Sequence, residues 1–224
     1  MKVTWLGQAG LLVRTEKTTV MIDPYLSNSV FKMNPANARR VPVDERFLQI
    51  CPDVLIFTHN HLDHYDPETV DHIIGKETGI VVLSPRSVWD EVRRYGGSQN
   101  YVVFDRHTQW TQKDVKFTAV KAVHSDPAAI GLLMEAEGKK LYVSGDTLYS
   151  TEILEDLPDD IDVAFLPVNG VGNNMNMHDA ARLAKDCKAR QAVPIHIGLF
   201  DSLKPEDFPC ENKLVLSMYE ETSL

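Results

Sequence analysis

The sequence predicts a single domain of mixed β-strands and α-helices that covers residues 1–224. Short apolar runs rich in β-forming residues recur along the chain, and amphipathic helical segments lie between several of them. No internal repeat, low-complexity tract or linker divides the sequence. The hydrophobic content of 43% is that of a globular protein with a full core.

The chain is expected to begin with strands alone. Residues 3–6, 11–14 and 18–22 are short β-rich runs separated by glycine-containing or charged turns, which is typical of an antiparallel meander. Residues 25–45 show no clear period and contain two prolines, so we expect a long loop. Its cations Lys32, Arg39 and Arg40 could bind an anionic group, although a solvated surface loop is the simpler interpretation.

Strands and helices then alternate. Predicted strands lie at residues 54–57, 80–83, 101–104, 115–120, 130–135, 140–143, 163–166 and 191–195. Predicted helices lie after Asp66-Pro67, at residues 85–95, 151–157 and 177–187, and, from a weak pattern, at 214–219. Asp66 and Pro67 supply an N-cap and a first-turn proline for the helix they precede.

The composition of the chain limits the binding partners and the cellular location that we expect. The net charge of −9 disfavours broad binding to nucleic acid or an anionic membrane. The expected partner is a small-molecule substrate, which could be anionic. The three cysteines form no Cys-x-x-Cys pair, which indicates reduced thiols in a cytoplasmic protein. We expect no export signal, because residues 1–8 lack a long apolar region and a following cleavage site, and no membrane span, because no apolar run approaches eighteen residues. A homo-oligomer is compatible with the sequence.

The chemistry is expected at Thr58-His59-Asn60-His61-Leu62-Asp63-His64, which follows the apolar run 54–57 directly. Imidazole and carboxylate are ligands that first-row divalent metals accept, and a loop at the end of a strand can direct several of them to one point. The alternatives are a solvated histidine-rich loop or a lone structural metal site. Crowded histidines repel one another once protonated, which favours a metal.

Further ligand-type residues follow other predicted strands. His124, Asp146 and His196 each come just after an apolar run. A single histidine or aspartate at a strand end is usually a hydrogen-bonded loop residue. Since strand ends on one edge of a sheet lie close in space, the joint occurrence with the histidine cluster predicts a shared metal site.

This ordered set resembles the motifs of metallo-β-lactamase superfamily hydrolases, over about residues 1–200. The resemblance implies an α+β protein with a four-layer αββα sandwich. It also implies that His59, His61 and His124 hold one metal ion and Asp63, His64 and His196 a second, while Asp146 bridges them. Zinc, manganese or iron would suit these nitrogen and oxygen ligands.

The same resemblance implies a reaction. Two divalent ions about 3.5–4 Å apart would generate a bridging hydroxide at neutral pH. Asp63 could also accept a proton during attack. Asp23, which ends the third predicted strand, is similar to an aspartate that orients a ligand histidine, and the alternative is a turn aspartate before proline.

Four segments resemble most the ascorbate-6-phosphate lactonase-like branch of the superfamily: residues 3–10, 21–24, 143–147 and 169–176. The resemblance implies hydrolysis of a lactone or related ester, such as that of a phosphorylated sugar. Candidate substrate contacts are Asn169, Asn174, Asn176 and Arg39, and the alternative for the asparagines is a turn-rich loop. The chain is shorter than the lactonase itself, and its loop at 169–177 is compressed.

The sequence is also compatible with other functions. A phosphodiesterase or nuclease could use the same metal pair, although the acidic charge counts against a polyanionic substrate. A non-enzymatic metal-binding protein would be expected to lack a ligand, and none is missing. A redox di-iron protein is a further alternative, without a flavin domain in the chain. His72, His107 and His178 receive no role.

Overall fold

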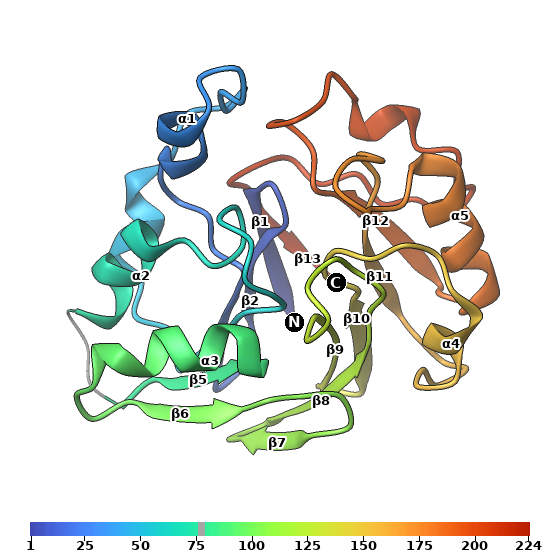
Figure 1. Cartoon of the computed structure of the whole chain (residues 1–224). Helices are drawn as coiled ribbons and strands as arrows, with labels where there is room; N and C mark the ends of the chain where they lie inside the picture. The colour runs from blue at the N-terminus through green and yellow to red at the C-terminus, as the bar shows by residue number, and fades with distance from the viewer. Residues whose placement is uncertain (76–78) are drawn as a thin grey trace.

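Two β-sheets pack face to face in the computed structural model, which describes residues 1–75 and 79–224, and helices lie on the outer sides (Figure 1). Among these residues, seven strands form the first sheet, in the order β13 (Glu221–Ser223), β1 (Lys2–Gly7), β2 (Gly10–Arg14), β3 (Thr19–Ile22), β4 (Val54–Ile56), β5 (Val81–Ser84) and β6 (Asn100–Val103). The second sheet has six, in the order β12 (Gln191–Ile195), β11 (Val163–Pro167), β10 (Lys139–Val143), β9 (Ile130–Ala136), β8 (Val115–Lys121) and β7 (Gln109–Gln112). The predicted antiparallel meander is confirmed in β1, β2 and β3.

Four helices among the described residues cover the sheets from outside: α2 (Pro67–Ile74), α3 (Arg86–Val92), α4 (Thr151–Leu154) and α5 (Met177–Asp186). The short helix α1 (Ser29–Met33) is not among them, and its Val30 packs with Tyr25 and Leu199. In Figure 1, α2 and α3 flank the first sheet, whereas α4 and α5 flank the second. The layers are therefore α, β, β and α, as the sequence resemblance implied. No helix within the described ranges is long and apolar enough to cross a membrane.

Alternation along the central strands builds the two packing layers, because successive strand side chains point to opposite faces. Ile22 and Ile56 belong to the core between the sheets, together with Leu132 of the second sheet. Their neighbours Met21 and Leu55 face outward into a cluster with the buried face of α2. Burial on both faces explains why these strands are continuous apolar runs.

The predicted start of α2 is confirmed. The carboxylate of Asp66 accepts hydrogen bonds from the backbone N–H groups of Glu68 and Thr69, and Pro67 occupies the first turn. Val70, Ile73 and Ile74 are buried against the first sheet. This capped helix fixes the far end of the histidine loop.

Several predictions about local structure are wrong. Residues 25–45 contain the short helix α1, and a 3₁₀ turn follows at Glu45–Gln49. Strand β7 was not predicted. Residues 214–219 form no helix: the chain there is irregular, and the backbone N–H groups of Leu214 and Tyr219 donate to the carbonyl oxygens of Ala192 and Trp5. The predicted helices at 85–95 and 151–157 are shorter, since α3 gives way to a 3₁₀ turn at Arg93–Tyr95 and α4 ends at Leu154.

Strand direction brings the ligand-type residues to one region. In the second sheet β10, β11 and β12 are parallel, and β8 runs the same way because both β8 and β10 are antiparallel to β9. In the first sheet β3 and β4 are parallel. The loops that carry Asp23, His59, His124, Asp146 and His196 all follow the carboxyl ends of these strands.

Candidate metal centre

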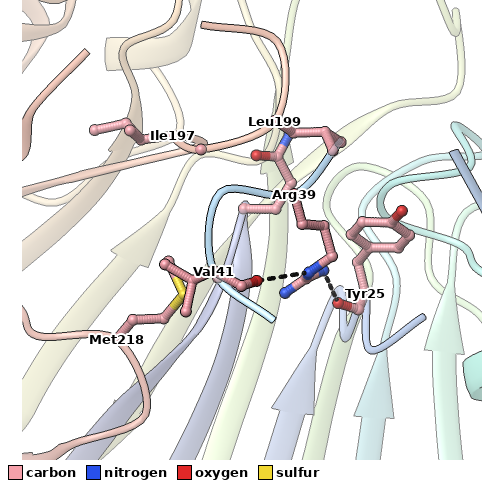
Figure 2. A pocket seen from close by; sticks show the side chains of 9 residues that line it. Tyr25, Arg39, Val41, Ile197, Leu199 and Met218 are labelled. Carbon is pink, nitrogen blue, oxygen red and sulfur yellow. Dashed lines mark hydrogen bonds between the residues drawn. The ribbon is translucent and has the colours of Figure 1, made fainter. Parts of the chain in front are cut away.

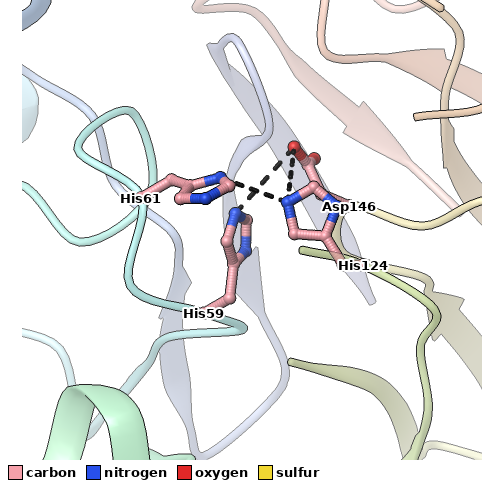
Figure 3. Close-up of side chains that lie close together, drawn as sticks. All are labelled: His59, His61, His124 and Asp146. Carbon is pink, nitrogen blue, oxygen red and sulfur yellow. Dashed lines mark hydrogen bonds and ion pairs between the residues drawn. The ribbon is translucent and has the colours of Figure 1, made fainter. Parts of the chain in front are cut away.

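The first group of side chains comprises His59, His61, His124 and Asp146, whose candidate ligand atoms all lie within 4.8 Å of one another (Figure 3). Nε2 of His124 is 3.1 Å from Nδ1 of His61. Nδ1 of His59 lies 3.1 Å from the Thr58 hydroxyl, which leaves its Nε2 directed to the group. Three imidazoles thus present a nitrogen to a common point.

The second group comprises Asp63, His64 and His196, all buried. Nε2 of His64 is 3.1 Å from Nε2 of His196, and Oδ2 of Asp63 is 3.2 Å from the same His196 nitrogen. These distances suit donor atoms that share one cation, since metal–nitrogen and metal–oxygen bonds are close to 2 Å.

Asp146 lies between the two groups. Its Oδ2 is 3.1 Å from Nε2 of His196, and 3.9 and 4.0 Å from Nε2 of His59 and His124. Its Oδ1 is 3.2 Å from Nε2 of His64. A single carboxylate therefore reaches both groups, as a bridging ligand requires.

The residues fit divalent metal ions. Nε2 of His59 is buried and has no hydrogen-bond partner in the part of the chain that the structure describes. Such an orphaned nitrogen is costly unless something else binds it. The donors are imidazole nitrogens and carboxylate oxygens without a thiolate, a set compatible with zinc, manganese or iron.

Without a metal ion, burial and neighbouring charges shift the pKa values of the second group and of Asp146. Burial would lower the pKa of His196, but the carboxylates of Asp146 and Asp63 outweigh burial and raise it to about 9. The pKa of His64 is likewise raised well above its usual value, since nearby carboxylates overcome burial. Burial would raise the pKa values of Asp63 and Asp146, yet the same histidines hold both below the usual range. The carboxylates stay charged, and a metal can supply the compensating positive charge.

Asp23 orients His64. Its Oδ2 lies 2.8 Å from Nδ1 of His64, and it accepts a hydrogen bond of 2.6 Å from the Thr58 hydroxyl. Its Oδ1 accepts the backbone N–H of Thr58 at 2.8 Å. Asp23 adopts a positive φ of 43°, a conformation that a non-glycine residue keeps only when its surroundings hold it there.

Side-chain amides hold other candidate ligands. The amide of Asn169 lies 2.8 Å from Nδ1 of His196, and Asn174 donates a hydrogen bond of 2.7 Å to Oδ2 of Asp146. Both asparagines are buried. Asn176 differs, because it is exposed and caps α5 by accepting the backbone N–H groups of His178 and Asp179.

Sequence reasoning missed Gln8 and Asp126. Nε2 of Gln8 donates to Oδ2 of Asp63 at 3.0 Å, and the backbone N–H of His196 donates to its carbonyl at 2.8 Å. Asp126 accepts the backbone N–H of Asn60, between two candidate ligands, at 3.2 Å. The available signals were the turn Gly7-Gln8-Ala9-Gly10 and the position of Asp126 two residues after His124.

Arg39 lies beside a small cavity that Gln8 also borders (Figure 2). Its guanidinium donates to the carbonyl oxygens of Tyr25 at 2.7 Å and Val41 at 3.4 Å, and to the Tyr219 hydroxyl at 3.1 Å. The structure therefore shows Arg39 joining its loop to the C-terminal segment.

The other cations and histidines lie elsewhere. Lys32 pairs with Glu68 at 2.7 Å, and Arg40 with Asp201 at 3.1 Å. Of the histidines without an assigned role, His107 contacts Asp156 at 3.0 Å, whereas His72 and His178 are exposed on α2 and α5.

Comparisons with known proteins identify the family and agree with this fold. Residues 18–197 match the family model described as a beta-lactamase superfamily domain, so the chain belongs to the metallo-β-lactamase superfamily. It is 32% identical over 226 residues to a UPF0173 metal-dependent hydrolase of Anoxybacillus flavithermus, with 93% of this chain and 92% of the relative covered. The chain is a member of the UPF0173 metal-dependent hydrolase family, and the predicted enzyme class is confirmed.

Solved structures show the same fold. Igni18, a metallo hydrolase from Ignicoccus hospitalis, superposes with a TM-score of 0.77 at 20% identity and covers 99% of this chain and 97% of its own. An isothiocyanate hydrolase from Delia radicum gut bacteria also has a TM-score of 0.77, at 18% identity, with 100% and 99% covered.

Proposed function

We propose that this metal-dependent hydrolase cleaves a lactone or a related carboxylic ester at a pair of divalent metal ions. The observation that carries the proposal is the position of Asp146, whose Oδ2 reaches one group of ligands at 3.1 Å and the other at 3.9 and 4.0 Å. His59, His61 and His124 would hold one ion, and Asp63, His64 and His196 the other. Zinc and manganese are the leading metals, with iron as a further option.

Bound metal ions would supply a nucleophilic water of lowered pKa and polarise the scissile bond. The chain's own residues contribute position and proton transfer. Asp23 and Asn169 fix the rings of His64 and His196 from behind, and Asn174 fixes Asp146. Asp63 carries a carboxylate at the edge of the second group, where it would accept the proton that attack releases.

Phosphodiester hydrolysis is the second candidate, because the same ligand arrangement serves phosphate esters in two-metal sites. The net charge of −9 counts against a large polyanionic substrate. A cytoplasmic location and the resemblance to the lactonase-like branch stay predictions.

Metal analysis of the Asp146→Ala variant tests the proposal. Purified protein loaded with zinc or manganese is expected to contain about two metal ions per chain by elemental analysis, and the variant should lose at least one together with ester hydrolysis. Asp159→Ala removes an exposed carboxylate and is the matched control. Unchanged metal content in Asp146→Ala would contradict the bridging role.

Substrate screening separates the two candidates. Metal-loaded protein is expected to hydrolyse simple lactones or carboxylic esters faster than bis(p-nitrophenyl) phosphate. Turnover of the phosphodiester alone would replace the proposed function with the second candidate.

A further inference from the structure

We infer that the non-reacting part of the substrate is uncharged and apolar, an alkyl or aryl group rather than a phosphorylated or polyhydroxylated one. This inference rests on the proposed function, because it concerns the substrate of the same metal centre. It follows from three observations: the segments that carry the ligands contain no lysine or arginine, three buried amide side chains beside the ligands are already engaged, and apolar side chains on these segments are exposed.

Cations are missing from the segments that carry the candidate ligands. Residues 59–66, 122–130, 144–150, 167–176 and 195–203 contain neither lysine nor arginine. Protein sites that recognise a phosphate normally supply one of these side chains. The three cations of the loop at 25–45 are engaged with protein groups, as described above. A phosphorylated substrate would therefore find no free cation of these segments beside its charge.

Three amide side chains beside the candidate ligands are turned toward these ligands. Asn169 contacts His196, Asn174 contacts Asp146 and Gln8 contacts Asp63. All three amide side chains are buried, with at most 9% of their surface exposed. These amide groups are engaged with the candidate ligands, so recognition of several sugar hydroxyls by them would require breaking these contacts.

Exposed apolar side chains accompany the ligands instead. Leu148 and Val171 are 41% and 46% exposed, and Leu62 and Phe200 are partly exposed. We call Leu62, Leu148, Val171 and Phe200 the apolar rim. A single exposed leucine would need no explanation, but four such side chains on the segments that carry the candidate ligands are consistent with a surface that binds an apolar group.

Backbone and ring contacts fix the rim relative to both ligand groups. The backbone N–H of Leu148, two residues after Asp146, donates to the carbonyl of Val123, which precedes His124. The ring of Phe200 stacks on the ring of His196 at 6.3 Å between centroids. These contacts place rim residues beside each of the two groups.

The other two residues of the apolar rim, Val171 and Leu62, lie on the loop of Asn169 and on the histidine loop. The backbone N–H of Val171 donates to the side chain of Asn169 at 3.3 Å. Leu62 lies between His61 and Asp63 in the sequence and packs with Phe200 against the cluster of Tyr25, Val30 and Leu199. An apolar group attached to a scissile bond at the metals would contact this rim.

A homologous series of γ-lactones tests the inference. Metal-loaded protein is assayed with γ-valerolactone, γ-hexanolactone, γ-octanolactone and γ-nonanolactone, and with gulono-1,4-lactone and a 6-phosphorylated sugar γ-lactone. Burial of each added methylene is expected to raise kcat/KM about three- to fourfold over the first few carbons. The hydroxylated and phosphorylated lactones should be at least about tenfold poorer than γ-nonanolactone.

Binding of the ring-opened products gives a readout without turnover. In titration calorimetry, the Kd of the 4-hydroxy acids should fall with tail length, and the heat-capacity change should become more negative. In the double variant Leu148→Asn and Val171→Thr, which keeps the number and branching of the side-chain heavy atoms, the dependence of Kd on tail length should fall by at least half. Val215→Thr makes the same change at an exposed valine of the C-terminal segment and should leave this dependence unchanged.

The outcomes separate the inference from the proposed function. Lactone hydrolysis that is insensitive to tail length, or that favours the phosphorylated sugar lactone, would overturn the inference and leave the proposed function standing. Absence of turnover with every lactone and ester by metal-loaded protein would overturn both.

Discussion

Asp126 shows how a residue that is not a candidate ligand can support the metal centre. One of its oxygens accepts hydrogen bonds from the backbone N–H of Asn60 at 3.2 Å and the hydroxyl of Ser87 at 2.6 Å. The other accepts the backbone N–H of Ala128 at 2.8 Å. Asp126 therefore joins the histidine loop to the loop that carries His124.

Replacement of Asp126 by Asn should weaken metal binding at the first group. One backbone N–H loses its acceptor, so His61 and His124 are held less firmly, and partners of this kind typically contribute 10- to 100-fold to metal affinity. Competition with a chromogenic chelator measures the change. Asp159→Asn is the control, and equal affinities of a folded Asp126→Asn protein and its parent would disprove this role.

The sequence predicted which ligand-type residues the structure brings together, but not the residues that hold them. All seven positions follow strand ends, and their residue types carry the metal chemistry. Gln8 and Asp126 could not be predicted, since an amide or a turn aspartate has many roles. Their contacts with Asp63 and Asn60 span 55 and 66 residues of sequence, and no local pattern reports them.

At the scale of elements, the sequence pattern predicted the strands that are buried on both faces and the helix that has one buried face. The apolar runs of β4 and β11 and the periodic face of α5 were predicted close to their observed bounds. Strand β7 was not predicted, because it is a half-exposed edge strand that contains two glutamines. Residues 214–219 showed a weak helical pattern but form irregular backbone, because Leu214 and Tyr219 make backbone hydrogen bonds with Ala192 and Trp5, which are distant in the sequence.

The N-cap of helix α2 is expected to contribute to the stability of the protein. Asp66 is fully buried and caps the helix directly after the histidine loop. Asp66→Ala should lower the free energy of unfolding by about 1–2 kcal/mol, because two backbone N–H groups lose their acceptor. Urea denaturation measures this loss.

The control for this cap is Asp90→Ala, at a half-exposed position on α3, for which a change within about 0.5 kcal/mol is expected. Equal urea midpoints for the Asp66→Ala variant and the parent protein would show that the cap does not stabilise α2.

At the scale of the whole molecule, metal-free protein should lose stability as pH rises. The folded pKa of His196 is about 9, above its unfolded value near 6.5, so its stabilising contribution is complete below about pH 6.5 and disappears as pH passes 9. This difference corresponds to roughly 3 kcal/mol for one group. The raised pKa of His64 acts in the same direction.

The stability of metal-loaded protein should instead increase as pH rises from 6 to 8. Ligand histidines bind metal only when deprotonated, so metal release should begin as pH falls, and the loaded protein should be more stable at pH 8 than at pH 6. Chemical denaturation of both forms at several pH values measures these trends. Parallel pH profiles of the two forms would contradict the coupling between protons and metal.

The pairing of β13 with β1 has a consequence for biosynthesis. Strand β1 is synthesised before β13, residues 221–223, which supplies the partner on its outer side. Until that segment leaves the ribosome, the nascent chain carries an open strand edge, which is a template for association with other chains. Chaperone protection of this edge during synthesis would favour a high yield of folded protein, and C-terminal tags that obstruct β13 should promote aggregation.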